Sequence, residues 1–226
     1  MVVVQPYRHN LKKGVEMLKG ESSTWCHFTR LEYVPSIMND GIKPGAGKGN
    51  LLRGAGYIYL FRPNALTVEQ FYHMGSWLYG DDIDGNWAVI TVSVNPDDLL
   101  MDEDPLAALV WEDDDEIFEK LPPKAAEEFI EFKETDLAKS GLCDKFTKWG
   151  EKFINKHNLK PNEMLQTDVM REVMLTAKIN KTLKAERIFV IDYYFENMLE
   201  IHNIEEFNEF IKQQEIQKIA DSITDE

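Results

Sequence analysis

The stretch that decides the fold reads Trp25-Cys-His-Phe-Thr29 and continues, after Arg30, as Leu31-Glu-Tyr-Val-Pro-Ser-Ile-Met-Asn-Asp40. Residues 25–29 have the aromatic and β-branched content of a short buried strand. In residues 31–40 the apolar side chains are spaced for one face of a helix, and Gly41 suits its C-terminal cap. The sequence therefore predicts a strand that leads directly into a short helix.

Outside this stretch, apolar and β-branched runs predict further strands. They cover residues 57–61, 87–94, 106–111, 172–176 and 187–194. Helical spacing of apolar side chains appears at 65–79, throughout 114–160, and in an amphipathic pattern from Ile204. Because strands and helices do not alternate regularly, the pattern favours an α+β fold over a doubly wound sheet.

The charged region 112–165 is predicted to be an acidic helical insertion in a single domain that spans residues 1–226. Its aromatic side chains recur at three- and four-residue steps, as in Phe146–Trp149–Phe153. That spacing is typical of a buried helical stripe. We therefore expect the aromatic side chains to pack inward, with the acidic faces in water.

The composition is that of a globular protein without a membrane-spanning segment. Hydrophobic residues make up 43% of the chain, and no apolar run approaches the ~20 residues that cross a bilayer. The first residues lack the basic segment and cleavage pattern of a secretory signal. Cys26 and Cys143 lie far apart, without the spacing of a disulfide framework or a zinc site. We therefore expect a cytoplasmic protein with no membrane partner.

The chain is strongly acidic, with 25 Lys and Arg against 40 Asp and Glu, a net charge of −15 and a pI near 4.8. Much of the excess lies in residues 97–136, and more follows from Glu205 to Glu226. Such a field repels phosphate backbones, so nonspecific nucleic-acid binding is not expected. Solubility is the simplest explanation of the charge. The first ninety residues are nearer balance, so a less acidic face there can still accept an anionic ligand.

Several common ligand motifs are missing from the sequence. The glycine-rich stretch 45–56 has neither the P-loop pattern nor a G-x-G-x-x-G between a strand and a helix, and it leads into a strand. We interpret it as a flexible connector or lid. The histidines are scattered, and the acidic runs lack the calcium-loop pattern, so no metal site is predicted.

Three pieces, in order, carry the functional signal. They are His27-Phe-Thr29 at the end of a strand, Tyr57-Ile-Tyr59-Leu-Phe-Arg62-Pro63, and Arg171-Glu172-Val-Met-Leu at the start of a late strand. Together they resemble the ADP-ribosyltransferase superfamily, in which H-x-T, an aromatic strand and a late glutamate surround NAD. Within that superfamily, the nearest resemblance is to the DarT type. The match covers about residues 25–66 and 170–192.

The resemblance implies a split sheet, mixed or antiparallel, with flanking helices and with NAD bound as a substrate. Cleavage of the nicotinamide glycosidic bond passes through an oxocarbenium-like centre on the ribose. A carboxylate that faces this centre stabilises the positive charge as it develops. The resemblance assigns this catalytic role to Glu172, which would otherwise be a surface residue at a strand start.

The resemblance also implies roles for the residues that bind NAD. His27 would hydrogen-bond to the adenosine-side ribose, with Thr29 supporting the pocket. Tyr57 or Tyr59 would stack on the nicotinamide, and Arg62 would pair with the pyrophosphate or with the acceptor. Each has a structural alternative: a hydrogen-bonded core histidine, tyrosines that face the core, and an arginine that ends a strand.

The resulting hypothesis is an NAD-dependent ADP-ribosyltransferase, or an NAD glycohydrolase, of a toxin or phage-related type, whose acceptor the sequence does not identify. Met170 stands two residues before Glu172, where transferases that modify protein arginine commonly have a second Glu or Gln. Protein arginine is therefore disfavoured as the acceptor. The alternative is a non-catalytic acidic protein on the same fold, which binds a nucleotide or a basic protein partner as DNA-mimicking inhibitors do.

Overall fold

The computed structural model describes residues 8–19, 23–45, 56–63, 87–103, 106, 110, 121–139, 144–161, 176–192 and 197–224. The helix predicted at 65–79 and the first four residues of the strand predicted at 172–176 lie outside these ranges. The chain divides into two compact units. Unit 1 comprises residues 1–42, 66–93 and 183–226, and unit 2 comprises residues 43–65 and 94–182.

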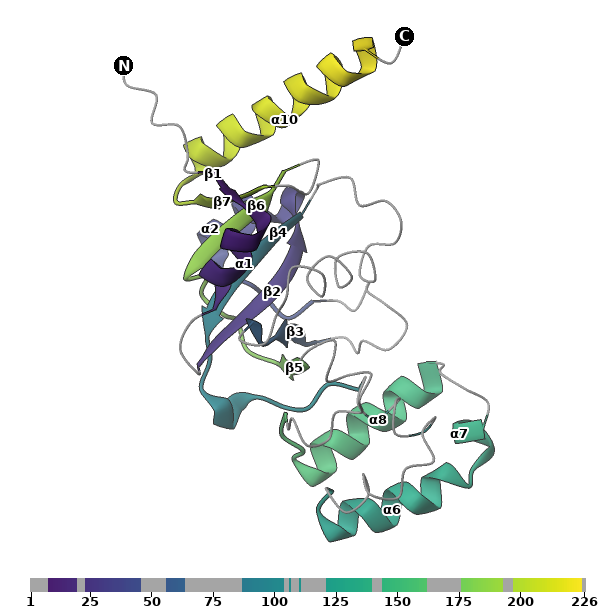
Figure 1. The fold of residues 1–226 in the computed structure, drawn as a ribbon. Coiled ribbons are helices and arrows are strands. Elements are labelled where there is room, and N and C mark those ends of the chain that lie inside the picture. Colours follow the sequence, from purple (N-terminus) through teal and green to yellow (C-terminus); the bar gives the residue numbers. More distant parts are fainter. Residues whose placement is uncertain are drawn as a thin grey trace. The chain divides into compact units, whose positions relative to one another are not determined.

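Unit 1 contains antiparallel strands in the order β1-β7-β6-β4-β2 (Figure 1). They are β1 (Arg8–Asn10), β2 (Thr24–Arg30), β4 (Trp87–Ser93), β6 (Arg187–Ile191) and β7 (Asn197–Ile201). β2 and β4 pair along their whole length, from Thr24 opposite Ser93 to Arg30 opposite Trp87. The strands predicted at 25–29, 87–94 and 187–194 are confirmed, although β6 ends at Ile191.

Helix α1 (Leu11–Leu18) follows β1 and packs on the strands of unit 1. The Asn10 side chain caps the helix by accepting a hydrogen bond from the Lys13 backbone nitrogen at 3.0 Å. Gly14 faces β7 so closely that a Cβ atom built there would lie 2.6 Å from the Cβ of Met198. The missing side chain at position 14 therefore lets the helix approach the strand.

The chain leaves β2 through a 3-10 turn, η1 (Leu31–Tyr33), and enters α2 (Val34–Asp40). Gly41 ends α2 with a φ of 77°, a left-handed conformation that favours glycine. The strand, the helix and the glycine cap all agree with the sequence, so this predicted step is confirmed.

The helix predicted from Ile204 is α10 (Ile204–Thr224), which follows β7. In its first half Phe207 and Phe210 are buried, whereas Ile216, Ile219 and Ile223 in the second half are 58–70% exposed. The apolar side chains of α10 are therefore packed against the protein mainly in the first half of the helix. Of the helices in the described ranges, none is long and apolar enough to span a membrane.

In unit 2, β3 (Ile58–Phe61) pairs antiparallel with β5 (Thr176–Ile179). β3 confirms the strand predicted at 57–61, and β5 begins at the last residue of the strand predicted at 172–176. Between α2 and β3, the described ends of the glycine-rich stretch meet. The Gly45 nitrogen donates to the Tyr57 carbonyl at 3.2 Å, and the Gly56 nitrogen donates to the Gly45 carbonyl at 2.8 Å.

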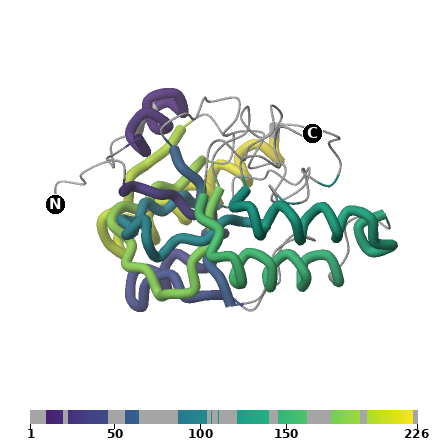
Figure 2. Tube along the Cα trace, turned by 90° about the horizontal axis from the view of Figure 1, so that it is seen from below, coloured from purple at the N-terminus to yellow at the C-terminus, as the bar shows by residue number. Residues whose placement is uncertain are grey.

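Three helices lie inside the region 112–165, where helices were predicted. They are α6 (Pro123–Lys133), α7 (Asp136–Lys139) and α8 (Asp144–His157). α6 and α8 lie side by side and antiparallel (Figure 2), with Phe132 stacked on Trp149 and Phe129 against Phe153. Phe129, Phe132, Phe146 and Phe153 are buried together in one apolar core, as their spacing predicted. Helices beside antiparallel strands make the fold α+β, as expected.

The strand predicted at 106–111 is wrong at Leu106 and Val110, the two residues of this range that the structure describes. Leu106 and Val110 are helical, and Leu106 is buried in the apolar core that α6 and α8 share. Their four-residue spacing places both side chains on one side of a helix, which contacts this core better than an alternating strand would. Short apolar runs do not distinguish the two structures by composition alone.

Candidate functional site

The candidate site lies in unit 2, where β5 has a neighbour on each side. Tyr59 of β3 stands opposite Lys178 of β5. On the other side, Leu100 forms an isolated bridge with Lys178, and each residue's backbone nitrogen donates to the other's carbonyl at 2.9 Å. The segment 100–103, which follows the 3-10 turn η3 (Pro96–Asp98), therefore starts beside β5.

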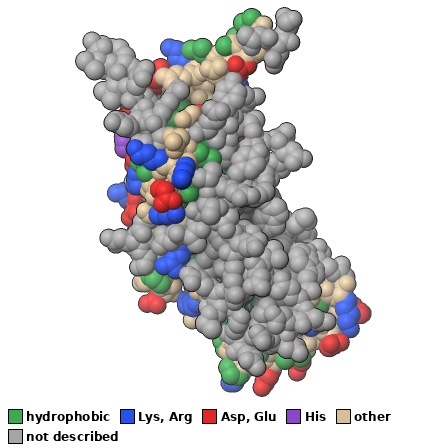
Figure 3. Space-filling view, in the orientation of Figure 1, with side chains coloured by type: hydrophobic (Ala, Val, Ile, Leu, Met, Phe, Trp, Pro, Cys, Tyr) green, Lys and Arg blue, Asp and Glu red, His purple; other side chains and the backbone are tan. Residues whose placement is uncertain are grey.

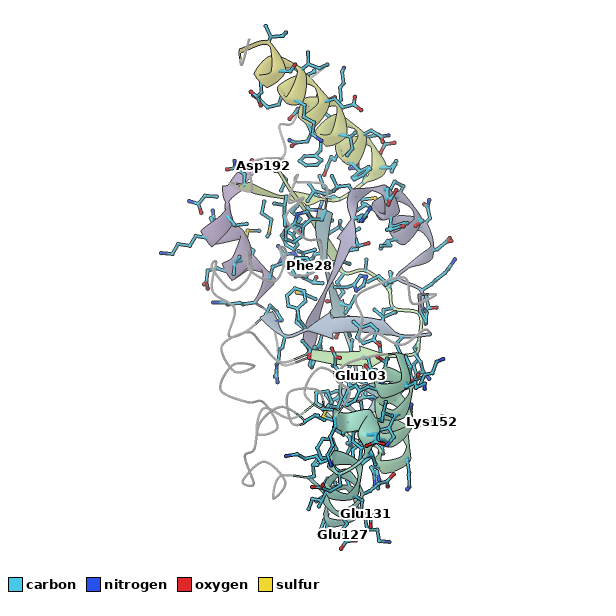
Figure 4. All side chains as sticks on the ribbon, turned by 90° about the vertical axis from the view of Figure 1, so that its right-hand side faces the viewer. Phe28, Glu103, Glu127, Glu131, Lys152 and Asp192 are labelled. Atoms are coloured by element: carbon cyan, nitrogen blue, oxygen red, sulfur yellow. The ribbon has the colours of Figure 1, made fainter. Side chains whose placement is uncertain are left out.

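A buried ion pair occupies this position. The Lys178 ammonium contacts the Glu103 carboxylate, and both side chains are 0% exposed. Figure 4 shows Glu103 between β5 and α8. Its aliphatic stem lies against α8 at Gly150, where an added Cβ would be 3.5 Å from the Glu103 Cγ. The carboxylate is therefore enclosed by a strand on one side and a helix on the other.

Both tyrosines of the predicted NAD pocket contact this pair. The Tyr59 hydroxyl donates to Glu103 Oε2 at 3.3 Å. The Lys178 Nζ lies 4.5 Å from the ring centroid of Tyr57, within the range of a cation–π contact. The Asn155 side-chain nitrogen of α8 donates to the Tyr57 hydroxyl at 3.0 Å. One polar network therefore joins both tyrosines to β5 and α8.

The protonation of Glu103 is balanced near neutral pH. Burial raises the pKa of the Glu103 carboxyl to about 7, against the lowering effect of Lys178 and with a further increase from Asp102. Desolvation disfavours a charge inside the protein, so it outweighs the attraction of a single ammonium. Near pH 7 the Glu103 carboxyl is therefore partly protonated.

His27 and Thr29 belong to unit 1 and lie on one face of β2, since alternate residues of a strand point the same way. His27 is half-buried and Thr29 is buried. Phe28, between them, points to the opposite face, where its ring lies 4.8 Å from that of Trp87 (Figure 4). The middle residue of H-x-T therefore fills the apolar core and leaves the other face to the two polar side chains.

The remaining predicted site residues belong to unit 2. Tyr57 and Tyr59 are half-buried in the network above, and Arg62 is half-buried just after β3. Glu172 lies outside the described residues. That all of these side chains line one cleft with His27 stays a prediction.

The surface of α8 carries several lysines, of which Lys156 pairs with Glu128 of α6 at 2.6 Å. A hollow is lined by Lys148, Glu151, Lys152, Asn155 and Lys156. Asn155 also bonds to Tyr57, so the hollow begins beside the predicted NAD residues. The lysine side chains suit an anionic ligand. Within the described ranges, no three His, Cys, Asp or Glu side chains gather closely enough to hold a metal ion.

The sequence reasoning missed Lys178 and Glu103. Lys178 interrupts an apolar strand, between Ala177 and Ile179, and a lysine in that place is a signal for a buried partner. Glu103 gave no such signal because it stands in an acidic run, Asp102-Glu-Asp104, which is typical of a solvated surface. Asp102 and Glu103 are in fact 0% exposed.

Comparisons provide no relative from which to transfer a role to these residues. Matches were sought among protein-family models, curated proteins and solved structures. None of the three comparisons found a match. The candidate site therefore rests on its own geometry and chemistry.

Proposed function

We propose that this chain is an ADP-ribosyltransferase that uses NAD as a substrate. The observation that carries the proposal is the position of His27 and Thr29. Both lie on one face of β2, and the strand leads within a few residues into α2, in the order that the resemblance to the DarT type requires. Placed in this way, the half-buried imidazole of His27 can bind a ribose from a rigid strand, with the buried Thr29 beside it supporting the pocket.

The network in unit 2 supports the same proposal. Asn155 holds Tyr57 beside the lysine-lined hollow of α8, and Tyr59 contacts Glu103 in the same network. Arg62 follows just after β3. Aromatic rings to contact the nicotinamide and cations to contact the pyrophosphate are the groups that a dinucleotide needs.

In the proposed reaction Glu172 carries the chemistry. The bond between the ribose and the nicotinamide breaks, nicotinamide leaves with the bonding electrons, and the ribose carbon becomes oxocarbenium-like. The Glu172 carboxylate stabilises that charge, and the acceptor nucleophile, or water, then attacks the same carbon. Transfer to an acceptor and hydrolysis of NAD are thus two outcomes of one cleavage step.

The test is nicotinamide release from NAD, followed by chromatography, with mass spectrometry of the protein for self-modification. Glu172→Gln is expected to reduce release by about 10²–10³-fold, because it removes transition-state charge stabilisation. Asp168→Asn, a carboxylate change four residues away, is the matched control and should leave the rate within about twofold of wild type. An unchanged rate in Glu172→Gln would remove this residue from the mechanism.

A second candidate is a non-catalytic acidic protein that binds a basic protein partner. The observation in its favour is the outer face of α6, where Glu127 and Glu131 are exposed one helical turn apart (Figure 4). The visible part of the surface over α6–α8 nevertheless shows acidic and basic side chains next to each other (Figure 3). Such mixed charge suits solubility as well as recognition.

Charge reversal separates the two candidates. Glu127→Lys together with Glu131→Lys should leave NAD cleavage unchanged, because surface charges beyond a Debye length of ~8 Å from a site are screened at physiological salt. A DNA mimic should instead lose binding to an immobilised basic protein such as a histone, and its binding should become less sensitive to salt. Loss of that binding in the charge-reversed variant, together with no NAD turnover in wild type, would favour the second candidate.

A further inference from the structure

We propose that Glu103 and Lys178 are positioning residues, which hold Tyr57 and Tyr59 in the orientation that binds NAD. This inference rests on the proposed function. Its geometric basis is that one buried ion pair contacts both tyrosines, each in a different way. The Glu103 carboxylate accepts a hydrogen bond from the Tyr59 hydroxyl, and the Lys178 ammonium lies over the Tyr57 ring.

The energetics of the pair argue for a role beyond stability. Removing two charges from water costs several kcal/mol per ion, and apolar side chains of the same volume often give an equally stable protein. Unlike apolar packing, an ion pair fixes the orientation of the side chains that contact it. The Glu103 carboxylate fixes the Tyr59 hydroxyl, and the Lys178 ammonium fixes the face of the Tyr57 ring.

The elements that carry the network make it rigid. Tyr59 and Lys178 face each other across paired strands, and Glu103 is enclosed by α8 at Gly150. Asn155, on the same helix, fixes the hydroxyl of Tyr57. A supporting shell on strands and a helix holds a binding side chain more accurately than a loop does. NAD would therefore meet two tyrosines that are already oriented.

The first experiment reads the tyrosine rings without any ligand. The protein is labelled with ¹³C on its tyrosine rings, and the signals of Tyr57 and Tyr59 are assigned by Tyr→Phe variants. In wild type the chemical shifts of both tyrosines should change with pH, with a midpoint at about pH 7, as Glu103 titrates. In Glu103→Gln both signals should shift, and this pH dependence should disappear. The groups that face Glu103 in the described structure are Lys178 from β5, Tyr59 from β3 and Asp102 beside it, while α8 presents Gly150.

The second experiment measures steady-state NAD cleavage. Glu103→Gln and Lys178→Met should each raise KM for NAD by about three- to tenfold with little change in kcat, the effect expected when about one charge-assisted hydrogen bond is weakened. Lys178→Arg keeps the charge and should recover part of the loss. If Lys178→Met does not fold, Glu103→Gln and Lys178→Arg still provide the measurement.

Glu200→Gln is the matched control. Glu200 forms a two-point ion pair with Arg187 in unit 1, where Nε donates to Oε1 at 2.7 Å and Nη2 to Oε2 at 2.8 Å. Its loss should lower stability slightly and leave both tyrosine signals and KM unchanged. Equal effects in Glu103→Gln and Glu200→Gln would reduce the buried pair to a general structural role and overturn the inference.

The two experiments separate this inference from the proposed function. Tyrosine signals that do not respond to Glu103→Gln would overturn the positioning role, whatever the protein does with NAD. Absence of nicotinamide release from wild type would overturn the proposed function. An increase in KM together with shifted tyrosine signals supports both.

Discussion

The two units differ in what they bury. In unit 1, β4 is an apolar strand, and Ala88, Val89 and Ile90 are fully buried between β2 and β6. In unit 2, three charged side chains are buried to the same extent: Asp102, Glu103 and Lys178. Among the described residues, these are the charged side chains with 0% exposure. Apolar burial stabilises a fold without specifying orientation, whereas buried charges demand defined partners, so the comparison identifies unit 2 as the place to look for binding geometry.

Breaking the pair on one side should have the largest effect on stability. Lys178→Met leaves a buried carboxyl without its ammonium and is expected to lower the free energy of unfolding by about 3–5 kcal/mol. The double variant Lys178→Met with Glu103→Leu should recover most of this loss, because no charge is then left unpaired. Urea denaturation of the two variants measures both values. In unit 1, Glu200→Gln breaks a half-exposed pair and should cost at most about 1 kcal/mol.

A cost below about 1 kcal/mol for Lys178→Met would contradict this expectation. It would mean either that water reaches Glu103 or that its carboxyl takes up a proton when the ammonium is removed, so that no unpaired charge is left buried. The contrast between the two units would then disappear.

The pH dependence of stability should show an effect on the order of 3 kcal/mol. Burial raises the Glu103 pKa from its ordinary value of 4.5 to about 7, so between these values the folded protein binds a proton that the unfolded chain has released. The contribution of this group is complete below about pH 4.5 and is lost as the pH rises to about 7. The free energy of unfolding of wild type, minus that of Glu103→Gln, should therefore fall between about pH 5 and pH 8. A constant difference across this range would show that Glu103 does not titrate there.

Much of the fold could be predicted from the sequence because local patterns agree with burial. β2, α2 and the cap at Gly41 follow one another as their side chains and the glycine indicate. The aromatic residues of α6 and α8 likewise have the spacing of a buried helical face, and they are buried together in one core. Where pattern and environment point to the same structure, the prediction holds.

The elements that were missed had weaker or conflicting signals. α1 has a capping Asn10 and buried residues Val15 and Leu18 at helical spacing, but it is a short helix, with lysines and Gly14 among its residues. β7 has only five residues, and its apolar Met198 and Leu199 are adjacent, so the period of two that marks a strand is missing.

The candidate site was predictable only in part. Tyr57 and Tyr59 were singled out because they stand in one of the three ordered pieces that carry the resemblance, and both contact the buried pair. Glu103 was not found, because its partner Lys178 is 75 residues away and nothing local distinguishes a buried acid from a solvated one. Pairing between distant segments is decided by tertiary structure, which a local pattern does not contain.

The smallest expected effects come from one helical glycine in each unit. Gly14→Ala places a Cβ 2.6 Å from Met198, so α1 or β7 must move, and overpacking of this kind costs about 1–3 kcal/mol. That cost should exceed the gain of about 1 kcal/mol that alanine brings to a helix. Gly150→Ala places its Cβ 3.5 Å from the Glu103 Cγ, an ordinary contact, so the helical gain of about 0.5–1 kcal/mol should remain. Thermal denaturation should therefore give a lower Tm for the first variant and a higher one for the second. A lower Tm for Gly150→Ala as well would mean that the wall of α8 beside Glu103 tolerates no added volume, and the buried network of unit 2 would then be packed as tightly as the apolar core of unit 1.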